Sequence, residues 1–171
     1  MTIKFAFSIA AAALLSTPAL AAGPTDPEIA HIAYTAGNLD IAAAKQALRI
    51  SKNKAVRSFA KEMVRDHEAV NVKALALVKK LHVTPAPNGV SAGLTKDADA
   101  TLKRLSKLRG RSFDRAYAQN EAAYHKAVNG ALKSTLIPSA DNGELKSLLE
   151  TGLTLFGEHQ KHAEHLAASL K

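Results

Sequence analysis

The clearest indication of fold class lies between Val56 and Leu81, in the segment V-R-S-F-A-K-E-M-V-R-D-H-E-A-V-N-V-K-A-L-A-L-V-K-K-L. It contains no Gly or Pro, and Asn53 just before it is a suitable N-terminal helix cap. Apolar residues recur in it at alternating steps of three and four, the spacing of one face of an α-helix. That face consists of Val56, Ala60, Met63, His67, Val70, Ala74, Leu77 and Leu81. The pattern predicts a long amphipathic helix with one histidine pointing inward.

Three more long helices and one short helix are expected along the chain. The sequence has only six prolines and nine glycines, and long stretches between them are rich in Ala, Leu, Lys and Glu, which favour helix. The expected helices run from Asp26, as N-cap, to about Ile50; from Asn53 to about Leu81; over residues 97–109, ended by Gly110; from Ser112, as N-cap, to about Leu136; and from Glu144 to the C-terminus, after a turn at Pro138, Asp141, Asn142 and Gly143.

These elements predict an all-α fold, a four-helix bundle. The first and last pairs of long helices are joined by short turns, so each pair is expected to be antiparallel. About thirty residues separate the second long helix from the third, which is enough to travel the length of a bundle. This long crossover, containing the short helix, favours a ferritin-like topology; an up-and-down bundle with an excursion is the alternative.

The first 21 residues have the pattern of a secretory signal peptide. Lys4 precedes an apolar run from Phe5 to Leu15, and Ala19 and Ala21 form a small-x-small cleavage pattern. The apolar run is too short for a permanent membrane anchor. We therefore expect cleavage after Ala21, which leaves a domain of residues 22–171 in the periplasm or outside the cell.

Composition restricts the partners and the ligands. The chain has no cysteine, so disulfides and thiolate metal ligands are excluded. Its formal net charge is +8, but the Lys and Arg residues are scattered among acids without interleaved aromatic residues. This distribution is typical of solvated helix surfaces and argues against a nucleic-acid partner. Weak association with an anionic cell envelope stays open, and the sequence indicates no particular protein partner.

Each of the four apolar faces is interrupted by a residue that can bind a metal ion. The first helix has Asp40 in a face of small residues, the second has His67, the third has His125 and the fourth has His159, with His162 as a further possibility. The fourth face is predicted as Leu145, Leu148, Gly152, Leu155, His159, His162 and Leu166. Candidates for the surrounding shell are Asn71, Tyr117, Glu121, Tyr124 and Glu158, whereas His31 and His82 are expected at the surface.

Three imidazoles and a carboxylate suit a zinc, iron, manganese or copper ion, and bundles build such sites from inward-pointing side chains. Binding through imidazoles is expected to fade below about pH 6.

Two alternatives to a metal-binding protein exist. In a structural protein, Asp40 bonds His67 or His159 in a polar layer that sets helix register. A di-iron enzyme needs about four inward carboxylates, more than this chain offers, so an enzymatic role is left uncertain and disfavoured.

Four segments together resemble the family catalogued as domain of unknown function 4142, small exported bacterial proteins. They are F-A-K-E-M-V-R-D-H (Phe59 to His67), F-D-R-A-Y (Phe113 to Tyr117), His125 and H-Q-K-H-A (His159 to Ala163). The resemblance implies a ferritin-like four-helix bundle in the periplasm, from a family to which no biochemical activity is assigned. It also matches the family's histidines to His67, His125 and His159. Relatives tend to carry glutamate at Asp40, an apolar or amide residue at Glu121 and proline at Thr154.

Overall fold

The computed structural model describes residues 23–170, and its regular elements over that range are all helical. No helix within this range is both long and apolar enough to cross a bilayer. The predicted signal peptide lies outside the described residues. The elements are α1 (Asp26–Ile50), α2 (Lys54–Lys80), α3 (Gly89–Leu105), α4 (Gly110–Ala131), a π-helical segment η1 (Leu132–Leu136), α5 (Ile137–Ser139) and α6 (Gly143–Ser169).

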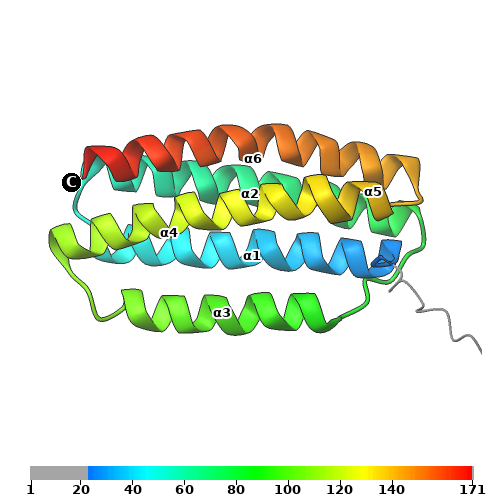
Figure 1. The fold of residues 1–171 in the computed structure, drawn as a ribbon, viewed down its shortest axis with the longest axis horizontal. Helices are drawn as coiled ribbons and strands as arrows, with labels where there is room; N and C mark the ends of the chain where they lie inside the picture. The colour runs from blue at the N-terminus through cyan, green and yellow to red at the C-terminus, as the bar shows by residue number, and fades with distance from the viewer. Residues whose placement is uncertain (1–22, 171) are drawn as a thin grey trace, which may run out of the picture.

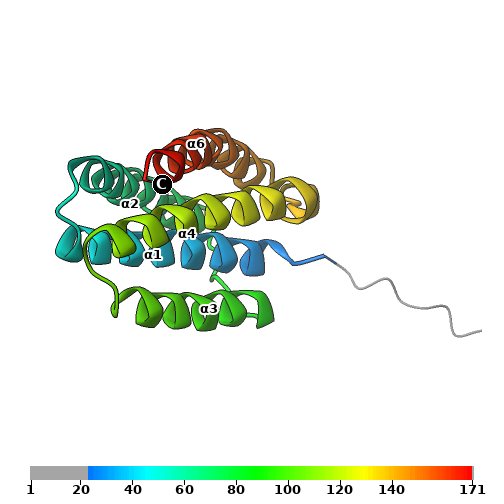
Figure 2. The same cartoon turned by 60° about the vertical axis from the view of Figure 1, so that its left-hand side comes forward.

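The long helices form an elongated bundle (Figure 1). Helix α1 packs against α2, and α4 packs against α6. Helix α3 lies outside this group, along α1, and Figure 2 shows it on the side opposite to α6. Because α3 carries the chain back along the bundle, α2 and α4 run in the same direction. The predicted all-helical bundle with a long helical crossover is therefore confirmed.

The start of α1 differs from the prediction in one residue. Its N-cap is Thr25, not Asp26. The Glu28 carboxylate accepts hydrogen bonds from the Thr25 backbone N–H and hydroxyl at 2.9 and 2.8 Å. Asp26 instead accepts from the backbone N–H groups of Asp141 and Asn142, at 3.0 and 2.9 Å. Its carboxylate thereby joins the start of α1 to the turn before α6.

The other caps explain where the expected boundaries fail. Asn53 caps α2 as predicted. The crossover helix begins at Gly89 rather than at residue 97, because Asn88 and Ser91 form a reciprocal capping box. It ends at Leu105, before the predicted end.

The third long helix also begins and ends differently. Gly110 does not end the crossover helix; it opens α4, with a φ of 55° that suits glycine, and the cap position is Arg109 rather than Ser112. The helix continues past Leu136 to Ser139, through the π-helical segment. Pro138 therefore lies within the helical run instead of ending it, and the turn follows at residues 140–142. The wider π turn comes just before a proline, whose missing N–H and bulky ring disfavour a regular α-helical turn.

The interior divides into two regions, which we call the packed end and the cavity end. At the packed end, α2 contributes Val56, Phe59, Ala60 and Met63, all 0 % exposed. At the cavity end, the apolar residues that α2 adds to the cluster are the partly buried Val70 and Leu77. The buried apolar residues there come from α1, η1, α6 and the turn before α6: Ile29, Ile32, Leu132, Leu136, Ala140, Leu145, Leu149 and Phe156.

Candidate metal centre

Each of the four long helices contributes one buried polar residue to the boundary between the two ends. Asp40 comes from α1, His67 from α2, His125 from α4 and His159 from α6. Their exposed fractions are 1, 3, 0 and 1 %. The packing of four amphipathic helices thus brings together residues that are up to 119 positions apart, as the difference between 159 and 40 shows.

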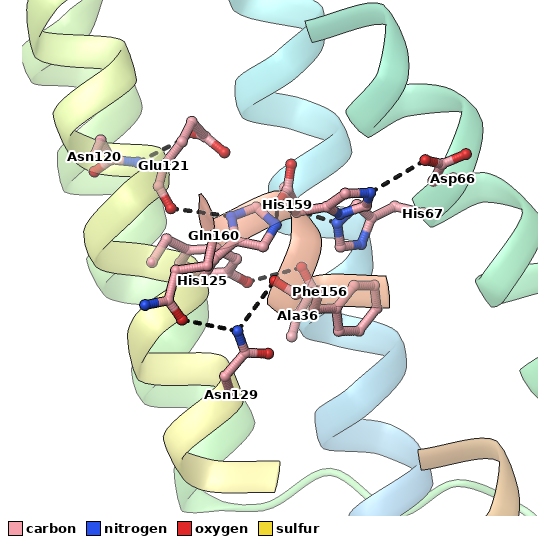
Figure 3. A network of polar contacts seen from close by, with 12 residues as sticks. Ala36, Asp66, His67, Asn120, Glu121, His125, Asn129, Phe156, His159 and Gln160 are labelled. Atoms are coloured by element: carbon pink, nitrogen blue, oxygen red, sulfur yellow. Dashed lines mark hydrogen bonds and ion pairs between the residues drawn. The ribbon is translucent and has the colours of Figure 1, made fainter. Parts of the chain in front are cut away.

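The three histidines form a compact group, drawn in Figure 3. One ring nitrogen from each lies within 4.8 Å of one from each of the others. The ring centroids are 5.7 Å apart for His67 and His125, and 5.4 Å apart for His159 and either of the other two. Phe156 stacks on His67 at 4.6 Å, with an interplanar angle of 7°. The apolar ring closes this side of the group.

Asp40 lies against two of the imidazoles. Its Oδ2 atom is 3.3 Å from the Nε2 atoms of both His67 and His125. Neither contact has the geometry of a hydrogen bond, so both Asp40 oxygens and both Nε2 atoms are buried without a partner. Buried polar atoms are normally hydrogen-bonded, so four partnerless atoms at one point indicate a missing partner.

Two of the imidazoles are oriented by bonds on their outer sides. His125 Nδ1 lies 3.0 Å from the Glu121 carbonyl oxygen, which can only accept, so Nδ1 carries the proton and the Nε2 lone pair is free. His159 Nε2 lies 3.1 Å from Asp66 Oδ2, and its Nδ1 is buried without a partner. Arg65 donates a hydrogen bond that lowers the pKa of Asp66, so Asp66 is ionised and the His159 Nδ1 lone pair is free. Metal-binding histidines are commonly held by such outer partners.

Burial controls the charge of the centre. It lowers the pKa of His67 to about 3, with smaller contributions from His125 and His159. It also lowers the pKa of His125 to about 4, although the bond to Glu121 opposes this. Burial raises the pKa of Asp40 to about 7. Both imidazoles are therefore neutral near pH 7, and their contacts with Asp40 are not ion pairs.

The loss of metal binding expected below about pH 6 stays a prediction, and the pKa directions indicate which group causes it. In the folded protein the imidazoles of His67 and His125 stay neutral well below that pH, because protonation would place a charge in a dry interior. The group that must lose a proton to act as a ligand is the Asp40 carboxyl.

A second buried carboxyl lies next to this group. Glu121, one turn before His125 on α4, is 1 % exposed, and its Oε2 atom has no partner. One oxygen each from Asp40 and Glu121 and one nitrogen of His125 lie within 4.8 Å of one another. Burial, followed by the charge of Asp40, raises the pKa of Glu121. Glu121 is thus a further ligand candidate rather than part of the surrounding shell.

His162 is not part of the group of three histidines. Its side chain is 43 % exposed, and its Nδ1 lies 3.0 Å from Glu62 Oε2. The predicted buried face of the fourth helix is wrong at alternate positions. The observed face of α6 is Leu145, Leu149, Gly152, Phe156, His159, Ala163 and Leu166. Turning Phe156 inward in place of Leu155 buries the larger side chain, and the same rotation moves His162 outward.

The predicted surrounding residues have varied positions. Tyr117 is fully buried with a partnerless hydroxyl, and Tyr124 donates a hydrogen bond to the Ala36 carbonyl oxygen at 2.8 Å. Asn71 donates to Asn38 at 2.9 Å instead of contacting a histidine. Glu158 is wrong as a shell residue, because it points outward and pairs with Lys161 at 2.8 Å.

Of the two histidines predicted at the surface, one is exposed and the other is not. His82 is exposed, whereas His31 is half-buried beside Thr35. Asp66, which holds His159, was absent from the predicted set. It precedes His67 directly, so it lies off the inward face of α2, and only the approach of α6 reveals its role. Its place next to His67 in the sequence gives no sign of the bond to His159.

The comparisons with known proteins place the chain in a family. The model of the family described as a domain of unknown function (DUF4142) matches residues 10–166. The chain belongs to this family. No curated protein and no solved structure matches it. The DUF4142 family has no assigned activity, so the function of this member has to be argued from its own residues.

Proposed function

We propose that this DUF4142 protein is an exported, ferritin-like helical bundle that binds a transition metal ion through His67, His125, His159 and Asp40. Zinc, iron, manganese and copper all suit neutral imidazoles with one carboxylate. The role is binding rather than catalysis, and Glu121 is a further ligand that the geometry adds to the set.

One observation carries the metal proposal. Nitrogen atoms of three buried histidines lie within 4.8 Å of one another, and the adjoining Asp40 carboxyl has no hydrogen-bond partner. A carboxylate in an apolar interior is costly unless a cation or donors stabilise it. A metal ion would stabilise the Asp40 carboxylate and would also accept the free lone pairs of His125 Nε2 and His159 Nδ1.

The ferritin-like and exported parts of the proposal rest on other features. The parallel course of α2 and α4, joined by the crossover helix α3, is the arrangement that a ferritin-like bundle requires. Export is supported by the sequence of residues 1–21, with its early lysine, short apolar run and small residues at the cleavage site. We propose a periplasmic or secreted location on this basis. An intact mass that begins at Ala22 in protein from the envelope supports it; a retained segment 1–21 contradicts it.

Thermal unfolding of protein without a histidine tag tests the metal proposal. A ligand at a hundred times its Kd adds about 2.7 kcal/mol to the free energy of unfolding, which raises Tm by roughly 5–10 °C for a domain of this size. We expect this rise with Zn²⁺ or another transition metal ion. His159→Ala abolishes it, whereas His165→Ala does not, because His165 lies on the same helix but is exposed. Equal metal-dependent shifts in both variants would contradict the proposed site.

The alternative is a structural protein with a hydrogen-bonded polar layer. The bonds from His125 to Glu121 and from His159 to Asp66 support it, because they give one nitrogen of each ring a partner within the protein. In that case His159→Ala lowers Tm by the same amount with metal or with chelator, since it removes the same contacts in both. Elemental analysis of the purified protein distinguishes the two: the structural alternative predicts no stoichiometric metal.

A further inference from the structure

A cavity of about 700 Å³ occupies the cavity end of the bundle. Protein interiors normally contain few voids larger than a water molecule, whereas pockets for small organic ligands measure roughly 300–1,000 Å³. The wall reaches the surface at the start of α3, where Val90 is 57 % exposed. The cavity has the size of a ligand site with access from solvent.

Small residues on facing helices create this cavity. Ala33 and Ala36 of α1, Ala74 of α2 and Ala127 and Ala131 of α4 all line it. The Leu, Val and Phe side chains that complete the wall do not fill the space between them. A space with such walls is poorly hydrated, and apolar molecules enter it in preference to water.

The charges of the wall decide the class of ligand. Among residues 23–170, no Lys or Arg lines the cavity. Glu28 is the single acidic residue among the described wall residues, and its carboxylate is already bonded to Thr25. An anionic or cationic head group in this cavity would therefore lack a counter-ion, which is unfavourable in apolar surroundings.

We propose that the cavity binds an uncharged, elongated apolar molecule of the long-chain alcohol or isoprenoid type. The apolar body contacts the leucine and valine walls, and an uncharged head reaches the histidines at the inner wall. His67 and His125 both line the cavity there, and their Nε2 atoms have no hydrogen-bond partner. This ligand site goes beyond the proposed metal binding. Its head-group contact uses Nε2 atoms that the metal proposal also uses, so the contact is assigned to the metal-free protein.

Fluorescence of N-phenyl-1-naphthylamine, an uncharged apolar probe, tests the proposal. The titration is made on the protein of residues 22–171 with EDTA present, so that failure of the metal proposal does not affect it. We expect saturable binding of one probe molecule per chain. We also expect 1-dodecanol to displace the probe at concentrations about tenfold or more below those of dodecanoate, which has the same chain length but a charged head. Absence of saturable binding, or equal displacement by the two compounds, would overturn the proposal.

Two matched variants locate the probe. Ala74 lines the cavity, whereas Ala76, on the same helix, is exposed and outside it. Ala74→Phe fills the cavity and is expected to weaken probe binding by about tenfold or more, while Ala76→Phe leaves it within about twofold. Equal affinity in the two variants would overturn the location. Circular dichroism checks their folding, and if Ala74→Phe does not fold, Ala33→Phe fills the same cavity from α1 with the same expected loss.

Discussion

The packed end and the cavity end are built on the same four helices but differ in how side-chain sizes alternate. At the packed end, the alanines Ala44, Ala47 and Ala60 lie among the rings of Phe59 and Phe113, all of them 0 % exposed. Small and large side chains interlock, and the helices approach closely. At the cavity end, small residues such as Ala33, Ala36 and Ala74 line the wall together with larger apolar side chains, and the space that they enclose stays open. Local amphipathic patterning is similar at both ends, so size complementarity, not apolarity, decides which end is dense.

The histidine group lies where these two regions meet. One side is sealed by the packed end, which removes water and shifts the pKa values of the buried groups. The other side is the cavity wall, to which His67 and His125 contribute. A dry site that borders a ligand-sized space is a position where metal and organic ligand can influence each other.

Substitution by alanine should change the free energy of unfolding most at the packed end of α2, and much less at its cavity end. Met63 is 0 % exposed at the packed end, whereas Leu77 is partly buried and lines the cavity. Met63→Ala should lower the free energy of unfolding by about 3–5 kcal/mol, because it leaves a new void. Leu77→Ala should cost about 1 kcal/mol, since its side chain already lacks neighbours on one side. Urea unfolding measures both, and equal losses would contradict the contrast.

A glycine pair tests how closely α1 and α2 approach at the boundary. A Cβ atom on Gly37 would lie 2.5 Å from Asn71 Oδ1, whereas one on Gly157 meets nothing within 4 Å. Gly37→Ala should therefore destabilise by about 1–3 kcal/mol through overpacking. Gly157→Ala should stabilise by about 0.5–1 kcal/mol, because alanine favours helix. The same sign for both changes in thermal unfolding would show that the helices separate more easily than their packing indicates.

The charge balance of the histidine group gives a pH prediction for the metal-free protein. The folded-state pKa values of His67 and His125, about 3 and 4, lie below their unfolded values, so these residues reduce stability as pH falls below about 6.5. Asp40 has a folded pKa of about 7, above its unfolded value, so it adds stability as pH falls from about 7 to 4.

The two effects oppose each other, and Asp40→Asn removes one of them. The variant should lose stability more steeply than wild type between pH 6.5 and 4, by about 1.4 kcal/mol per pH unit for one proton. Urea unfolding at several pH values in the presence of chelator measures the slopes. A slope that Asp40→Asn leaves unchanged would show that Asp40 is ionised in the folded protein.

The smallest effect is expected outside both ends, at the ion pair between Lys45 and Glu68. Their atoms lie 2.8 Å apart, but both side chains are 51 % exposed. Solvent screens such a pair, so Lys45→Ala should change the free energy of unfolding by about 0.5 kcal/mol or less. Urea unfolding at low and high salt checks this, and a loss comparable to that of Met63→Ala would contradict it.

Apolar periodicity in the sequence was sufficient to predict the helical class, the number of long helices and the inward side of α2. A period near 3.6 residues can be read wherever apolar positions are regular, as from Val56 to Leu77. It also singled out Asp40, His67, His125 and His159, because each interrupts an apolar face. Helix ends were less accurate, since caps such as the Asn88 and Ser91 pair depend on a few side-chain bonds.

Which residues meet could be seen only once the helices were packed together. The inward side of α6 depends on Phe156 packing against His67, and this contact moves His162 to the surface. The approach of α6 to α2 brings Asp66 to His159, although Asp66 lies off the predicted face. The cavity arises from small residues on three helices at once. Periodicity along one helix contains no information on the side chains opposite it, and those side chains determine contact, burial and empty space.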